Sequence, residues 1–356
     1  MHLDNALTKI SWSDFNQLSP VEKTPYLMRD NWPYHALIAQ QFNREMLDDL
    51  CSLATQIRTI AKTKQGSLFL QTLLDDKRIM LYFAQPSTRT FLSFASACQI
   101  LGAKTAEVRD TSTSSEIKGE SGEDSVRTFS SYFDMIIMRH PTGGFAERIA
   151  WVLSNSTRPI PLVNAGSGKD QHPTQALLDI YTLQRSFESL GGIEGKKIGF
   201  VGDLARGRTA RSLSLLLQHY PHIKLYYIAP HALQMQEDIL KALEAVNVPY
   251  EIAYNPKPLL PELDAIYMTR IQDEWDTDDN TDPVDNSVFC IEAKDLPLLK
   301  KTAIIMHPLP RRNEIDTEID ADPRAMYWPQ VRNGMWMRAA LILSIFGRAH
   351  ELLAWE

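Results

Sequence analysis

Residues 79–102 read IMLYFAQPSTRTFLSFASACQILG and join a strand pattern directly to a helix pattern. The apolar run from Ile79 to Ala84 has the length of a strand, and a polar segment follows it. Apolar residues then recur at helical spacing, at Phe91, Phe94, Cys98 and Leu101. Gly102 follows them, and glycine often ends helices. A strand that passes straight into a helix is typical of βαβ units, so this stretch predicts a parallel α/β sheet.

The same alternation continues in both directions along the chain. A helix is expected over residues 43–61 and another over residues 174–187. Further short apolar runs of strand length lie at 135–138, 160–163, 197–201, 224–228, 265–268 and 302–306. Helical patterns separate most of these runs, which predicts parallel sheets with helices on both faces.

The length of 356 residues corresponds to about two domains at roughly 150 residues each. The strand series restarts at Lys197, after the turn Leu190-Gly191-Gly192. We therefore predict two doubly wound parallel-sheet domains of similar size. The expected divisions are an N-terminal extension over 1–34, a first domain over 35–180 and a second over 181–330.

The composition is that of a folded protein without a general surface for anionic polymers. Hydrophobic residues make up 44% and charged residues 23%, which excludes a disordered or collagen-like chain. The formal net charge is −7, which argues against a general nucleic-acid or anionic-membrane surface. No apolar run approaches the roughly 18 residues of a bilayer span. Any anionic ligand must therefore meet a local basic pocket.

The three cysteines, Cys51, Cys98 and Cys290, are far apart and lack paired spacing. Neither a disulfide framework nor a zinc site is indicated. Reduced thiols and the absence of a basic, apolar leader at the start of the sequence lead us to expect a cytoplasmic protein.

Ligands of open α/β sheets bind beyond the carboxyl ends of the strands, so the residues there carry the functional prediction. After the first strand, Ser87 is expected to cap a helix whose first turn contains Thr88, Arg89 and Thr90. Free N–H groups, hydroxyls and a guanidinium together suit a phosphate. The alternative is an ordinary capped helix with a surface arginine.

Arg139 and His172 also follow predicted strands in the first half of the chain. Beside a phosphate site, a cation and a ring N–H donor could polarise a carbonyl group of the same ligand. The alternative for His172 is a cap or a packed side chain. No second histidine or carboxylate stands at metal-ligand spacing from His172, so we expect no metal.

The second half places Arg208 and Arg270 after strands, in the segments Gly202 to Thr209 and Thr269-Arg270-Ile271-Gln272. The first segment lacks both the dinucleotide-binding and the P-loop glycine patterns, so it gives little support to nucleotide binding. Two guanidinium forks at strand ends suit a ligand with two carboxylates. The alternative is that each arginine is a surface residue.

Taken together, five segments resemble the catalytic chains of aspartate carbamoyltransferases, within the aspartate/ornithine carbamoyltransferase superfamily. They are Ser87-Thr88-Arg89-Thr90, Arg139-His140-Pro141, His172-Pro173-Thr174-Gln175, Met268-Thr269-Arg270-Ile271-Gln272 and His307-Pro308-Leu309-Pro310. The resemblance covers residues 35–350. The His-Cys-Leu-Pro and Ser-Met-Gly segments typical of ornithine enzymes do not occur, so the second half favours aspartate as the acceptor.

The resemblance implies an enzyme with its active site between the domains, carbamoyl phosphate on the first and L-aspartate on the second. Residues 331–356 would return to the first domain. The reaction would give N-carbamoyl-L-aspartate and phosphate for pyrimidine synthesis, without a cofactor or metal. Alternatives are a carbamoyltransferase with another amino-acid acceptor, for which Arg270 and Gln272 are the discriminating residues, and a non-catalytic scaffold homologue.

The resemblance also assigns roles to individual residues. The catalytic set would be Arg89, Thr90, Arg139 and His172. Carbamoyl phosphate would be held by these residues together with Ser87, Thr88, Gln175 and the backbone carbonyls of Leu309 and Pro310. Aspartate would be held by Lys118, Arg208, Arg270 and Gln272.

Ser114 and Lys118 would come from a neighbouring subunit, which implies a homotrimer; a regulatory chain or a dihydroorotase is a possible further partner. Gln85 and Trp275 depart from the charged residues usual at these positions in the allosteric members of the family. The departure leaves family-style cooperativity open and does not affect the substrate contacts.

Overall fold

The computed structural model describes residues 6–109, 120–168, 171–270 and 286–355. The chain divides into two compact units. Unit 1 comprises Met1–Leu178 and Arg332–Glu356, and unit 2 comprises Asp179–Val331. The chain passes from one unit to the other within α8 (Pro173–Phe187) and again within α11 (Tyr327–Ile345). Each unit is described by itself below.

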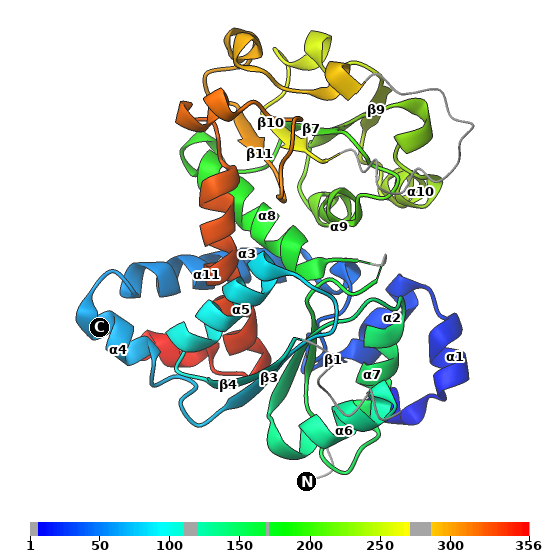
Figure 1. The fold of residues 1–356 in the computed structure, drawn as a ribbon, viewed down its shortest axis with the longest axis vertical. Helices are drawn as coiled ribbons and strands as arrows, with labels where there is room; N and C mark the ends of the chain where they lie inside the picture. The colour runs from blue at the N-terminus through cyan, green and yellow to red at the C-terminus, as the bar shows by residue number, and fades with distance from the viewer. Residues whose placement is uncertain (1–5, 110–119, 169–170, 271–285, 356) are drawn as a thin grey trace. The chain divides into compact units, whose positions relative to one another are not determined.

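Unit 1 contains a four-stranded parallel sheet in the order β4-β3-β5-β6. Figure 1 labels β3 and β4 of this sheet. The strands are β3 (Arg78–Phe83), β4 (Lys104–Val108), β5 (Met135–Arg139) and β6 (Leu162–Asn164). The chain goes from β3 outward to β4 and then returns to the other side of β3 as β5. The sheet therefore has its topological switch point between β3 and β5, where doubly wound sheets bind ligands.

One face of this sheet is covered by α6 (Gly122–Tyr132), α7 (Phe145–Ser154) and the N-terminal segment. Met80 of β3, Ile136 of β5 and Ile149 of α7 belong to one buried cluster. On the other side of the sheet, α5 (Thr88–Ile100) packs on β3 and β4, and α3 (Arg44–Ile60) packs on α4 (Lys64–Leu70). Asn43 begins α3 by accepting the Met46 N–H at 3.0 Å, which accounts for the start of the predicted helix.

The N-terminal segment is part of the core of unit 1. It contains η1 (Ala6–Lys9), α1 (Trp12–Gln17), α2 (Pro20–Leu27), the antiparallel pair β1 (Met28–Arg29) and β2 (Trp32–Pro33), and η2 (Ala39–Gln41). Leu7, Phe15 and Leu27 are fully buried against the sheet and α7, and Figure 1 shows α1 and α2 beside α7. The side chain of Trp151 on α7 donates a hydrogen bond to the Ile10 carbonyl at 3.0 Å. The sequence predicts residues 1–34 only as an extension and does not predict this packing.

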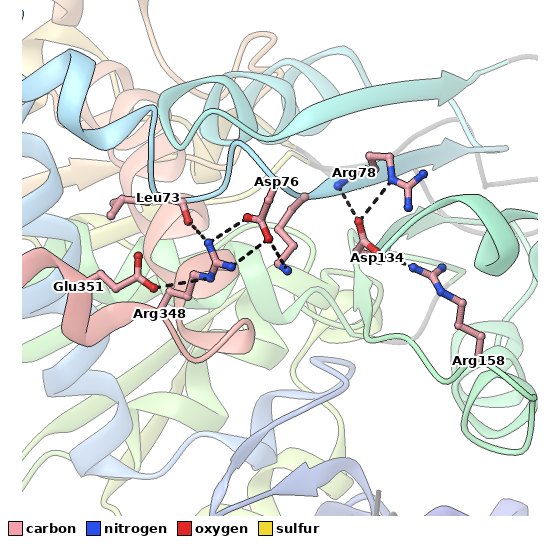
Figure 2. Close-up of polar contacts among 8 residues, drawn as sticks. Leu73, Asp76, Arg78, Asp134, Arg158, Arg348 and Glu351 are labelled. Atoms are coloured by element: carbon pink, nitrogen blue, oxygen red, sulfur yellow. Dashed lines mark hydrogen bonds and ion pairs between the residues drawn. The ribbon is translucent and has the colours of Figure 1, made fainter. Parts of the chain in front are cut away.

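The C-terminal end of the chain also belongs to unit 1 and ends with η12 (Ala349–Ala354). Figure 2 shows Arg348 reaching both carboxylate oxygens of Asp76, at 2.9 Å each, and the Leu73 carbonyl at 2.8 Å. In the same view the Asp134 carboxylate, which immediately precedes β5, accepts the backbone N–H of Arg78 at 2.9 Å. These contacts lie at the amino ends of β3 and β5, the edge opposite to the predicted ligand residues.

Unit 2 contains a five-stranded parallel sheet in the order β11-β10-β7-β8-β9. Its strands are β7 (Lys197–Val201), β8 (Lys224–Ile228), β9 (Tyr250–Ala253), β10 (Ala265–Met268) and β11 (Ile304–Met306). The remaining elements are α9 (Arg208–Leu217), α10 (Glu237–Ala245), η5 (Glu188–Leu190), η6 (His231–Leu233), η7 (Lys257–Leu259), η9 (Asn286–Phe289), η10 (Ala293–Leu298) and η11 (Thr317–Ala321). The switch point lies between β7 and β10.

The predicted α/β class with a parallel sheet in each domain is confirmed. The apolar runs quoted from the sequence form β3, β5, β6, β7, β8, β10 and β11. Sequence reasoning missed β4 and β9, which are edge strands with mostly exposed or half-buried side chains and so lack a continuous apolar run. Among the described helices, none is long and apolar enough to cross a membrane.

Candidate active site

The carboxyl ends of β3 and β5 bring the first group of predicted residues to one edge of the unit 1 sheet. Phe83 pairs with Arg139 in the parallel register, and the Gln85 N–H donates to the Arg139 carbonyl at 3.1 Å. The segment that leads to Ser87 therefore leaves the sheet beside Arg139. This is the switch point of unit 1, where a ligand meets the ends of two diverging loops.

The segment Ser87 to Thr90 forms the start of α5. Ser87 occupies the N-cap position with an extended backbone, as predicted, but its hydroxyl accepts no capping hydrogen bond from the helix. The predicted side-chain cap is therefore not formed in this structure. Thr88 and Arg89 are exposed and Thr90 is buried, so the first turn offers hydroxyls and a guanidinium at the end of a helix that favours anions.

A tight turn after β6 brings Arg139 and His172 together. Asn164 forms this turn by accepting the N–H groups of Gly166 at 3.0 Å and Ser167 at 2.8 Å. Gly166 has φ +94°, and a Cβ atom there would lie 2.6 Å from the His172 ring and 3.0 Å from Nη1 of Arg139. Both side chains thus converge on the space that a glycine leaves open.

His172 lies immediately before α8 and is 4% exposed. Gln175 follows in the first turn of that helix, where its backbone N–H donates to the His172 carbonyl at 3.0 Å. A guanidinium and a buried imidazole around one turn, close to the β3–α5 segment, can stabilise negative charge that develops on a ligand oxygen.

In unit 2, the ends of β7 and β10 hold the two predicted arginines at one edge. Thr269 donates its N–H at 2.7 Å and its hydroxyl at 3.0 Å to the Val201 carbonyl, which ties the residue before Arg270 to the end of β7. Gly202 permits this approach, since a Cβ there would lie 2.3 Å from the Thr269 carbonyl oxygen. Arg208 is the first residue of α9, which follows β7.

The third strand end of unit 2 at this edge is that of β11, which pairs with β10. Its continuation, His307 to Pro310, contains a cis peptide between Leu309 and Pro310, and Leu309 has φ +54°. A left-handed backbone costs a residue with a Cβ atom about 1–2 kcal/mol. The surrounding structure must therefore hold this segment in place.

Comparison with known proteins assigns both units. Residues 34–185 match the carbamoyl-P binding domain of the aspartate/ornithine carbamoyltransferases, and residues 194–345 match the Asp/Orn binding domain of the same proteins. The chain belongs to the aspartate/ornithine carbamoyltransferase family. The resemblance inferred from the five sequence segments is thereby confirmed.

Individual relatives within the aspartate/ornithine carbamoyltransferase family are similar over most of the chain. The chloroplastic aspartate carbamoyltransferase of Oryza sativa is 38% identical over 314 residues, 87% of this chain and 84% of the relative. The catalytic subunit of M. jannaschii aspartate transcarbamoylase superposes with a TM-score of 0.77 at 34% identity, covering 88% of this chain and 98% of that one. The Trypanosoma cruzi enzyme in complex with carbamoyl phosphate and aspartate gives 0.76 at 35% identity, with coverages of 87% and 94%.

Some of the residues predicted from the family resemblance lie outside the described part of the chain: Ser114, Lys118, Gln272 and Trp275. Asn164 and Gly166 shape the turn beside Arg139 and His172, and they were not identified from the sequence. The available signal was a glycine two residues after an asparagine at the end of an apolar strand run. Within the described ranges, no three His, Cys, Asp or Glu side chains are grouped as metal ligands.

Proposed function

We propose that this chain is an aspartate carbamoyltransferase, which transfers the carbamoyl group of carbamoyl phosphate to the amine of L-aspartate. The observation that carries the proposal is the convergence of Arg139 and His172 on Gly166, beside the start of α5. The match to a carbamoyl-P binding domain supports the assignment. The names of the rice, M. jannaschii and T. cruzi relatives favour aspartate as the acceptor.

In this proposal unit 1 binds carbamoyl phosphate. Ser87, Thr88, Arg89 and Thr90 hold the phosphate, while Thr90, Arg139 and His172 face the carbonyl oxygen and Gln175 the amide nitrogen. The neutral aspartate amine attacks the carbamoyl carbon, a C–N bond forms, and the C–O bond to phosphate breaks. The amine proton leaves with the phosphate. The protein contributes position and stabilisation of the charge on the carbonyl oxygen.

Unit 2 binds aspartate in the same proposal. Arg208, Arg270 and Gln272 hold its two carboxylates, and the carbonyls of Leu309 and Pro310 orient the amino groups of both substrates. The match of residues 194–345 to an Asp/Orn binding domain supports this assignment. Two anionic substrates repel each other, so a cluster of guanidinium groups is needed to hold them together even though the chain has a net charge of −7.

The decisive experiment measures carbamoylated product from carbamoyl phosphate with the purified chain and either L-aspartate or L-ornithine. Turnover with aspartate alone is expected. Arg208→Ala should lower kcat/KM for aspartate by about a hundredfold. Arg211→Ala is the matched control, because Arg211 lies on the same helix and pairs with Asp238 at 3.1 Å. Turnover with ornithine would support a different acceptor, and no turnover would support the scaffold alternative.

The assembly forms a separate part of the proposal. A homotrimer in which Ser114 and Lys118 act in the neighbouring site should have three times the chain mass by light scattering. A mixture of Lys118→Ala and His172→Ala chains, each inactive alone, should regain part of the activity. No recovery in mixed trimers would contradict the shared site. A regulatory chain or dihydroorotase would appear as a heavier complex in a pull-down from the source cells.

The proposal also includes a cytoplasmic location. Cys51 and Cys98 are buried free thiols, which is consistent with a reducing compartment such as the cytoplasm. The rice relative is chloroplastic by name, so fractionation of the source cells is the appropriate test. Recovery with an organelle would contradict the cytoplasmic assignment.

A further inference from the structure

A chain of buried polar side chains in unit 2 connects three secondary-structure elements to the segment after β11. The Asp179 carboxylate accepts the Tyr267 hydroxyl at 2.7 Å and the Gln330 amide at 2.6 Å. Gln330 in turn accepts the backbone N–H of His307 at 3.0 Å. Asp179, Gln330 and His307 are each at most 1% exposed. Buried polar groups are costly unless their hydrogen bonds are made, so this network holds the three elements and the His307 backbone in one arrangement.

The ring of His307 continues this network to Leu309. Its Nδ1 atom accepts the Leu309 N–H at 2.7 Å, and its Nε2 atom lies 2.7 Å from Oε1 of Glu314. Because Nδ1 is an acceptor, it carries no proton, so the neutral ring bears its proton on Nε2 and donates it to Glu314. The two contacts therefore define one tautomer and one ring orientation.

Glu314 is itself held in place. Its carboxylate accepts the backbone N–H of Arg312 at 3.0 and 3.1 Å. Burial alone would raise the pKa of the Glu314 carboxyl, but the hydrogen bonds from His307 and from the backbone lower it below its usual value. The carboxylate stays ionised near neutral pH and remains an acceptor for the His307 ring.

The hydrogen bond to the His307 ring comes from Leu309, whose backbone conformation is unfavourable. Leu309 has φ +54°, in the left-handed region that residues with a Cβ atom disfavour. Backbone in such a region persists only where its surroundings impose it, and such positions cluster at functional sites. The hydrogen bond from the Leu309 N–H to His307 is a direct constraint of this kind.

We infer that His307 is a positioning residue, which acts through the Leu309 N–H to aim the main-chain carbonyls of Leu309 and Pro310. This inference rests on the proposed function, in which those carbonyls orient the substrate amino groups. His307 touches neither substrate in this assignment. Its effect is transmitted by the hydrogen bond from the Leu309 N–H, and the contacts with Glu314 and Gln330 hold His307 in position.

Two substitutions separate this role from simple packing. His307→Asn keeps an acceptor for the N–H two residues on, because asparagine side chains form this local hydrogen bond. His307→Leu fills similar space but cannot accept it. Both variants lose the ring Nε2–H that faces Glu314, and they differ in whether the side chain can accept the Leu309 N–H.

Kinetics and binding give the first readout. A displacement of about 1 Å of an orienting group can cost about a hundredfold, so His307→Leu should lower kcat/KM for carbamoyl phosphate by about that factor. His307→Asn should lose about tenfold or less, the worth of one net hydrogen bond. Calorimetry should show weaker binding of carbamoyl phosphate to His307→Leu but unchanged binding of inorganic phosphate, which contacts unit 1 only. Equal loss of both ligands would overturn the inference in favour of general damage.

Deuterium exchange of a peptide containing Leu309 gives a second readout that does not depend on turnover. Protection of this amide should be present in the wild type and in His307→Asn and lost in His307→Leu. Unchanged protection in His307→Leu, or wild-type kinetics for that variant, would overturn the inference. If the wild type has no turnover, the proposed function fails, and the exchange experiment still decides whether His307 holds Leu309.

Discussion

Replacing Gly166 by alanine should disable the site in unit 1 by moving His172 and Arg139. A Cβ atom at this position would lie 2.6 Å from Cδ2 and 2.9 Å from Nε2 of His172, and 3.0 Å from Nη1 of Arg139. Comfortable contacts between carbon atoms begin near about 3.5 Å. The imidazole must therefore retreat by about 1 Å, and the φ of +94° adds backbone strain of about 1–2 kcal/mol.

A displacement of about 1 Å in a catalytic group can cost about a hundredfold in rate, or about 2.7 kcal/mol of transition-state stabilisation. Gly166→Ala should show this loss in kcat/KM, measured as N-carbamoyl-L-aspartate formed. Gly191→Ala is the matched control, because Gly191 has φ +84° and open space around its Cβ position. It should lose stability without losing activity. Gly166→Ala with wild-type kcat/KM, or with no greater loss than Gly191→Ala, would refute the reasoning.

Three further predictions concern stability. In urea titrations, Phe15→Ala in the N-terminal segment should lower the free energy of unfolding by about 3–5 kcal/mol. Val21→Ala, at a position that is 68% exposed, should change it by at most about 0.5 kcal/mol. Equal effects of the two substitutions would exclude core packing by this segment. Burial, with a smaller effect of Arg29, lowers the pKa of His35 to about 3, so as the pH falls the imidazole is protonated first in the unfolded state. The free energy of unfolding should therefore drop by about 2 kcal/mol between pH 7 and pH 5. A His35→Gln variant whose free energy of unfolding falls equally steeply with pH would contradict this. Arg348→Ala should cost about 1–2 kcal/mol because it loses a partly exposed ion pair and a carbonyl contact, and Asp76→Ala should cost less because the carbonyl contact remains; the reverse order in thermal unfolding would contradict this account.

The sequence predicted the strands that are buried on both faces, because continuous apolar runs mark them directly. The edge strand β4, Lys104–Val108, has mostly exposed side chains, and its alternation is too weak to distinguish it from a loop. The N-terminal segment was recognised as an addition, but its packing could not be predicted. Phe15 contributes to the core only because α7 presents a complementary apolar face, and that pairing is a tertiary property.

The positions of the candidate site residues at the sheet edges were predictable because strand ends of parallel sheets meet at one edge. Arg139 ends β5 and Arg270 lies two residues after β10, and each of these strands borders a switch point. The residues that position them were not predictable in the same way. Asn164 and Glu314 act by accepting N–H groups from neighbouring turns, and those turns are defined only once the strands are ordered. Ser87 is the opposite case, because the sequence predicts a capping hydrogen bond that the structure does not contain.

Each unit has a glycine with a positive φ after a strand, next to one of its arginines or to the residue before one. In unit 1 a glycine after β6 lets Arg139 and His172 converge, and in unit 2 a glycine after β7 lets the Thr269 backbone approach before Arg270. Each glycine has a positive φ and no room for a Cβ atom. An arginine at a strand end is therefore not sufficient in either unit, because the neighbouring strand end must also come close to it. In unit 1 Gly166 leaves the space on which Arg139 and His172 converge, and in unit 2 Gly202 leaves the space that the Thr269 carbonyl occupies, so each glycine is as necessary to its own strand edge as the arginine beside it.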